Sequence, residues 1–380
     1  MKIAINCAFL QPKGGGIKEY ILNLVDNLYR EDKENTYVCY CLADNLDYAR
    51  KKLPPGISIK TIPFNSSTKL DVIKRSLTET NFWRKEEERE NFDIFHSPFF
   101  HAPKLKNTPV VLTVHDMRFY RFPETYDFMR YHFLKHKVKN SVKRASHIIS
   151  ISRFTKDELV EAYGLEPEKI TVVHEAINPE RFKAEASAVT DAALPELKDS
   201  PFLLAVGHLE PRKNYDRLIA AFEKIKATGR FPGLKLVIVG KKGHSYSGTL
   251  KLIASDPDII YPEFVSHETL LWLYGNAALH IFPSYYEGFG FPPLEAAMQG
   301  TVSAVSNISC MPEVCGDAVF YFDPYDIDNM AEVITEGLEK GPSYAHKKDL
   351  LATQLHKYSW KKNALETISV YNRLKKEMHL

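Results

Sequence analysis

Apolar residues along the chain gather into short runs, and amphipathic stretches separate most of these runs. The first run, Ile3–Phe9, is apolar at nearly every position, which is typical of a strand buried on both faces of a parallel sheet. Further strands are predicted at Tyr37–Leu42, Ile57–Ile62, Ile94–His96, Val110–Val114 and His147–Ile151. Strands that alternate with helical stretches predict an α/β fold with a mostly parallel sheet.

A second series of the same kind begins at residue 202. Its predicted elements are the strand Phe202–Val206, the helix Tyr215–Ile225, and the strands Lys235–Val239, Leu279–Phe282, Val302–Val305 and Ala318–Tyr321. Residues 184–200, rich in Ala, Pro and acidic residues, are interpreted as a linker. Because 380 residues exceed what one core usually supports, we predict two facing Rossmann-like domains, 1–184 and 200–357, with a ligand cleft at the strand ends.

The composition is that of a soluble globular protein, with 44% hydrophobic and 26% charged residues. The formal charge of +2 argues against a nucleic-acid partner. None of the five cysteines has Cys-x-x-Cys spacing, and Cys39 and Cys41 alternate within a predicted strand, so we expect core thiols, a reducing compartment and no zinc site. Met1–Leu10 is too short for a signal peptide and no run is long enough to span a bilayer, so we expect a cytoplasmic protein.

Two charged stretches allow more than one interpretation. Residues 68–91 form either a helix or an ordered surface loop. Residues 128–156 contain no acidic residue, carry many Lys and Arg, and include Tyr131, Phe133 and Leu134. A helix of this kind could lie on an anionic membrane surface, or it could simply present a solvated basic face.

The stretch Phe282–Gln299 carries the strongest chemical signal. A predicted strand ends at Pro283, and a helix containing Pro293 and Leu294 follows the loop Glu287–Phe291. Two glycines let this loop bend tightly, so its amides and the helix N-terminus would form an anion site. Glu287 and Glu295 flank the site and could accept hydrogen bonds from sugar hydroxyls. An ordinary strand-loop-helix corner with two solvated carboxylates is the alternative.

A second candidate follows the strand Phe202–Val206. Gly207 begins the loop there, and Arg212 and Lys213 precede the next helix, so both cations lie at the carboxyl end of a strand. Arginine as a bidentate fork and lysine as a point charge can neutralise a diphosphate. The alternative is that these charges face water at a helix start.

The first predicted domain offers weaker candidates. The chain begins with the order of elements that is typical of nucleotide-binding folds: the strand Ile3–Phe9, the glycine run 14–16 and a helix. However, Glu19 stands where a dinucleotide motif needs its third glycine. A flexible turn explains the glycines equally well. His115 ends a strand, where it could bond a sugar hydroxyl or assist a proton transfer, or could be purely structural.

Other motifs of catalysis are missing. The chain has neither a Gly-x-x-x-x-Gly-Lys-Ser/Thr loop nor a Gly-x-Ser-x-Gly elbow. Asp256-Pro-Asp258 and Asp326-Ile-Asp328 have the spacing of metal-binding pairs in some sugar transferases, but their polar surroundings favour turns or helix caps.

Together these residues resemble the retaining glycosyltransferases of family 4, which have the GT-B fold. The resemblance is strongest from residue 202 to residue 328. Its motifs there are Glu287-x7-Glu295, Pro211-Arg-Lys-Asn214, Asn307-Ile-Ser-Cys-Met-Pro-Glu313, Gly316-Asp-Ala318 and Asp323-Pro324. The first domain matches through 14–16, Val114-His-Asp116, Phe122-Pro-Glu124 and Ile151–Leu159, and the tail matches at Tyr358-Ser-Trp360. The resemblance implies that residues 358–380 cross back to the first domain.

The resemblance also implies roles for individual residues. Glu287 would contact the donor sugar and Glu295 the ribose hydroxyls. Arg212 and Lys213 would hold the diphosphate, and His115 would sit beside the sugar and the acceptor. The remaining donor-binding candidates are Gly15, Gly16, Gly207, Phe289, Gly290, Phe291 and Leu294. No cofactor and no metal are expected, because the two cations would do a metal's electrostatic work.

The implied reaction retains the anomeric configuration by front-face attack, with the departing phosphate accepting the acceptor's proton. GDP-mannose is the first expectation for the donor, with UDP-sugars and dTDP-rhamnose behind it, and a saccharide or lipid-linked saccharide is expected as acceptor in surface polysaccharide assembly. Two departures from the family stand out: the segment His174–Asn178 replaces the usual Asn-Gly-Val-Asp, and Lys18 is unusual at its position. A nucleotide-sugar epimerase and a non-catalytic nucleotide-sugar binding protein are the competing hypotheses.

Overall fold

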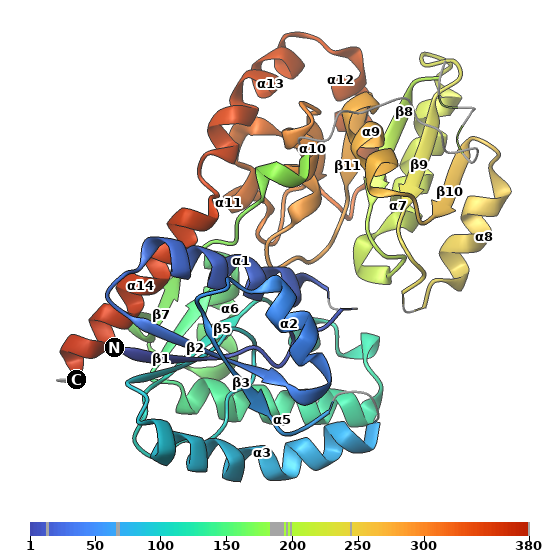
Figure 1. The fold of residues 1–380 in the computed structure, drawn as a ribbon. Coiled ribbons are helices and arrows are strands. Elements are labelled where there is room, and N and C mark those ends of the chain that lie inside the picture. Colours follow the sequence, from blue (N-terminus) through green and yellow to red (C-terminus); the bar gives the residue numbers. More distant parts are fainter. Residues whose placement is uncertain are drawn as a thin grey trace. The chain divides into compact units, whose positions relative to one another are not determined.

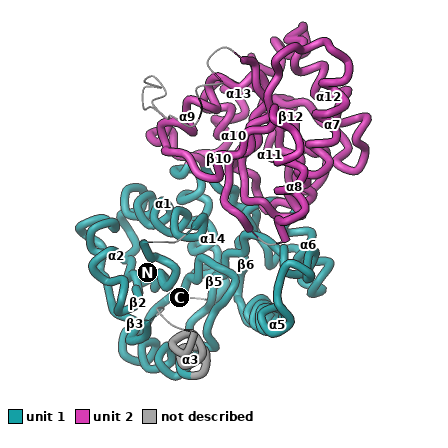
Figure 2. Tube along the Cα trace, turned by 90° about the vertical axis from the view of Figure 1, so that its right-hand side faces the viewer, with its two compact units in different colours: residues 1–176, 360–380 teal, residues 177–359 magenta. Residues whose placement is uncertain are grey.

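The computed structural model describes residues 1–12, 15–65, 69–182, 200–243 and 245–378, together with Leu194 and Leu197. The side chains of residues 69–77 lie outside this description. The chain divides into two compact units, Met1–Ala176 with Trp360–Leu380 as unit 1 and Ile177–Ser359 as unit 2. Figure 1 shows the elements along the chain, and Figure 2 shows the two units.

Unit 1 is built on a 7-stranded sheet with the order β3-β2-β1-β4-β5-β6-β7, as counted over its described residues. Every pairing in it is parallel. The strands are β1 (Lys2–Asn6), β2 (Thr36–Leu42), β3 (Ser58–Ile62), β4 (Ile94–Ser97), β5 (Val110–Val114), β6 (His147–Ser150) and β7 (Ile170–Val172). The helices are α1 (Gly16–Glu31), α2 (Leu46–Lys52), α3 (Lys69–Glu90), α4 (Arg118–Arg121), α5 (Phe128–Arg144), α6 (Arg153–Tyr163) and α14 (Trp360–Glu377).

The sheet of unit 1 is buried on both faces, because alternate residues of its strands belong to two separate cores. Ile3 and Ile5 of β1 pack with residues of α1 and α14, while Ala4 between them belongs to the opposite core with Trp83 of α3. Helix α14 therefore completes one face of unit 1, although it comes last in the chain (Figure 1).

A buried histidine helps to fix α14 on this sheet. His96 of β4 contacts the Tyr371 hydroxyl with Nδ1 at 2.6 Å and the Thr113 hydroxyl with Nε2 at 2.9 Å. Burial, together with the positive charge of His115, lowers the pKa of His96 to about 3. His96 is therefore neutral at physiological pH and acts as a hydrogen-bonding element of the core.

Unit 2 repeats the architecture with a 6-stranded parallel sheet, ordered β10-β9-β8-β11-β12-β13 over its described residues. The strands are β8 (Phe202–Val206), β9 (Lys235–Val239), β10 (Ile259–Glu263), β11 (Leu279–Phe282), β12 (Ser303–Ser306) and β13 (Phe320–Phe322). The helices are α7 (Tyr215–Ala227), α8 (Ser247–Ser255), α9 (His267–Asn276), α10 (Phe291–Met298), α11 (Met311–Cys315), α12 (Ile327–Glu339) and α13 (Pro342–Leu355).

Both sheets reverse their strand order beside the first strand of the unit. In unit 1, β1 lies between β2 and β4, and in unit 2, β8 lies between β9 and β11. The loops that follow the two strands at such a point run in opposite directions, which opens a crevice at the carboxyl edge of the sheet. In unit 2 these loops begin at Gly207 and Pro283, so the fold itself brings the two candidate stretches of this unit to one edge.

The predicted α/β class with two Rossmann-like sheets is confirmed, and the differences are local. Strands β7 and β10 were not predicted; both are edge strands, and β10 contains Pro262 and a register shift. Residues 69–90 form helix α3 rather than a surface loop. The basic stretch 128–156 is not one helix, because α5 ends at Arg144 and strand β6 follows.

The predicted domain boundaries differ from the division of the structure. The first domain was predicted to extend to residue 184, whereas unit 1 ends at Ala176 before it resumes at Trp360. Most of the predicted linker 184–200 lies outside the described residues. Cys39 and Cys41 are buried free thiols in the core of unit 1, as predicted. None of the described helices combines the length and the apolar character that a bilayer span requires.

Candidate active site

The loop after β8 carries two cations into the carboxyl edge of the unit 2 sheet. Pro211–Lys213 form one turn of 3-10 helix, and Asn214 then takes a left-handed conformation (φ 59°) before α7 begins. The Asn214 amide donates to the Pro324 carbonyl at 2.9 Å, which fixes this unusual backbone. Lys213 is only 6% exposed, and its ammonium lies 4.6 Å from the centroid of the Phe282 ring.

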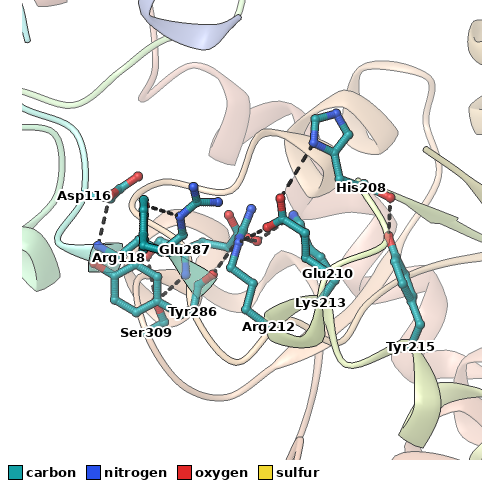
Figure 3. Close-up of polar contacts among 12 residues, drawn as sticks. Asp116, Arg118, His208, Glu210, Arg212, Lys213, Tyr215, Tyr286, Glu287 and Ser309 are labelled. Carbon is teal, nitrogen blue, oxygen red and sulfur yellow. Dashed lines mark hydrogen bonds and ion pairs between the residues drawn. The ribbon is translucent and has the colours of Figure 1, made fainter. Parts of the chain in front are cut away.

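Glu287 is the common acceptor for both cations. Arg212 Nη1 donates to Glu287 Oε1 at 2.7 Å, and Lys213 Nζ donates to the same oxygen at 2.6 Å. Arg212 Nη1 also donates to the Tyr286 carbonyl at 3.0 Å, and Arg212 Nε donates to Glu210 Oε2 at 2.9 Å. Figure 3 shows the guanidinium of Arg212 between the two carboxylates.

The charges of this cluster balance, because the carboxylates of Glu210 and Glu287 accept hydrogen bonds from the two cations. Burial on its own would raise the pKa of Glu287, but the charges of Arg212 and Lys213 outweigh burial and lower that pKa to about 2. Burial lowers the pKa of Lys213, and the Glu287 charge opposes this shift. Glu287 is thus ionised at any physiological pH. Buried ion pairs of this kind gain little net stability because both partners lose their hydration, so a binding role accounts for them better than a structural one.

The backbone after Glu287 is clamped by a serine from the β12–α11 loop. Glu287 N donates to Ser309 Oγ at 3.0 Å, and Ser309 Oγ donates to the Glu287 carbonyl at 2.7 Å. Ser309 itself has a positive φ of 62°. A seryl hydroxyl that both donates and accepts in this way holds the first residue of the loop without using the Glu287 carboxylate.

The glycine that starts helix α10 is required by its surroundings. Gly290 has φ 88°, and a Cβ added to it would lie 2.2 Å from Met311 Cε. The helix then continues with Phe291, Pro292 and Pro293, and the two prolines carry no N–H. The amides present at this end of the helix are therefore those of residues 289–291 and 294.

The other predicted donor residues of unit 2 lie around this loop. The Phe289 ring is buried and packs on the rings of Phe291 and Tyr358, with centroids 5.2 and 5.3 Å away. Leu294 is buried in the same helix. The Tyr274 hydroxyl, on α9, donates to Glu295 Oε2 at 2.7 Å. Burial raises the pKa of Glu295, whereas the Tyr274 hydrogen bond lowers it.

The predicted glycines have different structural explanations. A Cβ on Gly207 would come within 3.0 Å of both Lys213 Cε and the Tyr215 hydroxyl, so close packing requires this glycine. Gly15 and Gly16, at the start of α1, would meet nothing within 4 Å, and α1 has no side-chain cap. Within unit 1, neither close packing nor a positive φ requires a glycine at these two positions. Gly14, the first residue of the predicted glycine run, lies outside the described residues.

His115 follows β5 and has protein partners on both ring nitrogens. Nδ1 lies 2.6 Å from Glu175 Oε1, and Nε2 lies 3.0 Å from the Pro98 carbonyl. The Tyr20 ring meets the imidazole edge-on, with centroids 4.7 Å apart. The side chain was expected to offer its ring to a substrate, and the structure adds a buried carboxylate that the sequence analysis did not assign.

Four residues that build these sites were not singled out from the sequence: Glu210, Glu175, Ser309 and Tyr274. Glu175 lies in the segment His174–Asn178, whose departure from the usual family sequence was noted, but no role was assigned to it. Ser309 lies within the motif Asn307–Glu313 but was given no role there, and Tyr274 carried no signal, since a helical tyrosine occurs anywhere. Asp256 and Asp326 form the predicted turn and helix cap: Asp258 N donates to Asp256 Oδ1 at 2.9 Å, and Asp326 caps α12.

Comparison with known proteins matches a glycosyltransferase family model to each unit. The model of Glycosyltransferase Family 4 matches residues 14–181, and that of Glycosyl transferases group 1 matches residues 189–349. The chain belongs to the family 4 glycosyltransferases. It is therefore a transferase enzyme with the GT-B fold, as its sequence motifs predicted.

Curated relatives of this glycosyltransferase include enzymes of O-antigen synthesis. The O-antigen chain mannosyltransferase B of Escherichia coli is 28% identical over 289 residues, which cover 74% of each protein. The O-antigen chain mannosyltransferase RfbU of Salmonella typhimurium is 29% identical over 228 residues, 59% of each protein. The chain spans only 29% of the larger Escherichia coli mannosyltransferase WbdA, with 30% identity.

Solved structures share the fold along nearly the whole glycosyltransferase. Sucrose-phosphate synthase from Thermosynechococcus elongatus superposes with a TM-score of 0.74 at 16% identity and covers 99% of this chain and 100% of that chain. Anabaena HepE in complex with UDP-glucose gives 0.70 at 16% identity, covering 97% and 100%. WaaG, a lipopolysaccharide glycosyltransferase, gives 0.67 at 15% identity, covering 97% and 99%.

Proposed function

We propose that this glycosyltransferase moves a hexose, with mannose from GDP-mannose as the first assignment, to a saccharide or lipid-linked saccharide acceptor during surface polysaccharide assembly. The reaction retains the anomeric configuration and needs no metal ion. The observation that carries the proposal is the largely buried cluster of Arg212, Lys213 and Glu287, which lies where the unit 2 sheet reverses its strand order. Relatives named as O-antigen mannosyltransferases favour mannose and a polysaccharide acceptor.

The cations of the cluster suit a diphosphate better than any neutral ligand. A planar guanidinium and an ammonium lie on neighbouring residues, both directed at one carboxylate oxygen. An oxygen of a phosphate group can take the place of that carboxylate oxygen with the same charge-assisted hydrogen bonds. As the bond to the anomeric carbon breaks, negative charge grows on the leaving diphosphate, and fixed cations in a buried site stabilise that charge strongly.

Because the cluster is balanced without ligand, a diphosphate must compete with Glu287 for Arg212 and Lys213. The displaced carboxylate would then accept hydrogen bonds from hydroxyls of the donor sugar. In this proposal, binding of the diphosphate is what frees the Glu287 carboxylate to contact the sugar. Glu295, supported by Tyr274, would take the ribose hydroxyls.

Unit 1 also carries residues that we assign to donor binding. Gly15 and Gly16 have open space where a side chain would stand, so their loop can come close to a phosphate or sugar. In the transfer, the bond between the anomeric carbon and the diphosphate oxygen breaks, and a bond to the acceptor oxygen forms on the same face. The acceptor's proton passes to the departing diphosphate oxygen, so no other base is needed.

We also propose that α5 rests on an anionic membrane at the cytoplasmic face, where a lipid-linked acceptor would be found. Phe128, Met129 and Phe133 expose 74%, 76% and 46% of their surface. The exposed cations of the same helix are Arg130, Lys135, Lys139, Lys143 and Arg144. Apolar side chains beside several lysines and arginines match the chemistry of an anionic lipid surface.

A calorimetric screen tests the donor assignment. GDP and GDP-mannose are expected to bind more tightly than UDP, dTDP and their sugars, and turnover with GDP-mannose is expected to yield an α-linked product from the α-linked donor, as NMR of the product would show. EDTA should leave turnover intact because the cations supply the charge. Preference for another base would reassign the donor, and an inverted product or loss of activity in EDTA would overturn the mechanism.

Lys213→Ala is expected to weaken binding of nucleoside diphosphate by about tenfold or more, since one charge-assisted contact to the diphosphate is lost. Binding of the free nucleoside should hardly change. Isothermal titration with both ligands measures the difference. Lys224→Ala, which removes a half-exposed lysine of α7 paired with Asp328, is the matched control. An equal loss for nucleoside and nucleoside diphosphate would show that Lys213 does not hold the diphosphate.

Glu287→Gln should separate binding from turnover. Removal of the competing charge should tighten binding of nucleoside diphosphate by about tenfold, the scale of one charged hydrogen bond. Turnover should fall by about 10²-fold because the sugar is no longer oriented. Titration calorimetry and steady-state kinetics measure the two effects. Glu339→Gln, whose carboxylate pairs with Arg230 on the surface of unit 2, should change neither. Weaker diphosphate binding in Glu287→Gln would contradict the competition.

Cosedimentation with vesicles tests the membrane contact. The wild-type protein should bind vesicles that contain phosphatidylglycerol and should not bind vesicles of phosphatidylcholine alone. The double variant Phe128→Ser with Phe133→Ser should lose most of this binding while its thermal stability stays within a few degrees of the wild type, because both rings are exposed. The control Phe264→Ser removes a ring that is 71% exposed in unit 2. Equal loss in the control, or binding to neutral vesicles, would refute a role for α5.

A further inference from the structure

His115 lies between two oxygen atoms of unit 1 that accept hydrogen bonds. Its Nδ1 is 2.6 Å from Glu175 Oε1 and its Nε2 is 3.0 Å from the Pro98 carbonyl oxygen. A carbonyl oxygen can only accept, and so can an ionised carboxylate, whereas a neutral imidazole has a single N–H to donate. Both contacts are satisfied at once when each ring nitrogen carries a hydrogen, which is the imidazolium ion.

A neutral imidazole could satisfy the same contacts only if Glu175 held the proton instead. Burial lowers the pKa of His115, but the hydrogen bond and charge of Glu175 outweigh burial, and the Pro98 carbonyl and Asp116 act in the same direction, so the pKa of His115 is raised. The proton of the pair thus resides on the ring. Glu175 is 5% exposed, so this carboxylate acts on His115 with little screening by water.

The other groups that face His115 agree with this charge state. His96, on the neighbouring strand β4, is neutral and hydrogen-bonded to Tyr371 and Thr113. Tyr20 of α1 presents its ring edge-on, and burial raises the pKa of its phenol, so it carries no charge. Asp116, the next residue in the chain, adds a second negative charge on the solvent side.

The segment that carries Glu175 is held from two directions. His115 binds its side chain, and Asn363 of α14 donates to the His174 carbonyl at 2.7 Å. This segment, 174–178, departs from the sequence that is usual in family 4, so the pairing follows from this structure rather than from the resemblance. Glu175 has no contact with another cation among the described residues that would give it a different task.

We propose that Glu175 is a positioning residue that holds His115 as a fixed imidazolium, so that His115 supports the transfer as a positive charge and cannot act as the base that takes the acceptor's proton. The inference rests on the proposed function. It leaves the departing diphosphate oxygen as the group that accepts this proton while the new glycosidic bond forms.

The test compares Glu175→Gln with the wild type by two independent measurements. Glutamine keeps an oxygen that can accept from Nδ1, but it brings no charge. In protein with ¹³C-labelled histidine, the His115 signal, identified by its absence in His115→Gln, should keep the imidazolium form in the wild type to a higher pH than a free histidine does. In Glu175→Gln the signal should titrate about two or more pH units lower, because burial then dominates the pKa.

The kinetic readout distinguishes a fixed cation from a base by the sign of its pH dependence. In Glu175→Gln, kcat/KM for the acceptor should fall as pH rises, by about tenfold for each unit above the lowered pKa, because the cation is lost. If His115 acted as a base, the same variant would instead gain activity as pH rises. That outcome would overturn the proposal, and so would a neutral His115 in the wild type or an unshifted titration in the variant.

Glu158→Gln provides a matched control, since it also removes a buried carboxylate from an ion pair of unit 1, with Arg121 at 2.7 Å. It should lower thermal stability without moving the His115 titration or the pH profile. The failure of the proposed function looks different from the failure of this inference. If the wild type turned over no nucleotide sugar, the proposed function would be wrong, while the ¹³C titration would still decide the charge of His115.

Discussion

One largely buried carboxylate, that of Glu287, is shared by two cations of unit 2. Arg212 and Lys213 follow β8, Glu287 follows β11, and the contacts bridge loops that are 74 and 75 residues apart in the chain. Glu287 is an ion-pair partner of both cations: it accepts from the buried Lys213 ammonium and from Arg212, which also donates to Glu210 and to the Tyr286 carbonyl. Under the proposed function, the same oxygen atom marks the place that a phosphate oxygen of the donor takes.

The topology explains why this cluster can exist at all. Parallel strands end at one edge, and the reversal of strand order beside β8 separates the loops that leave this edge. In unit 1 the corresponding loops follow β1, β4 and β5, and they carry Gly15, Pro98 and His115. Each unit thus presents its chemistry-bearing residues at the same kind of edge, while the cores on the two faces of each sheet keep that edge rigid.

The sequence was informative wherever a short segment determines its own structure. Apolar runs such as Val110–Val114 and Phe202–Val206 predicted the central strands, because such strands are buried on both faces. The edge strands β7 and β10 were not predicted, because β7 has only three residues and β10 contains Pro262. Arg212, Lys213 and Glu287 could be named as residues of one site, but their mutual contact could not. The contact between His115 and Glu175 could not be predicted either, because the two residues are 60 positions apart and no local pattern joins them.

The two prolines at the start of α10 have a further consequence for recognition. Helices that hold phosphate usually offer several peptide nitrogens at their first turn, and here Pro292 and Pro293 remove two of them. Attraction for an anion must then come mainly from side chains, whose charge acts over a distance and is sensitive to dissolved salt. Under the proposed function, affinity for the donor would accordingly change with single substitutions of charged residues, whereas a site built from peptide groups would respond less.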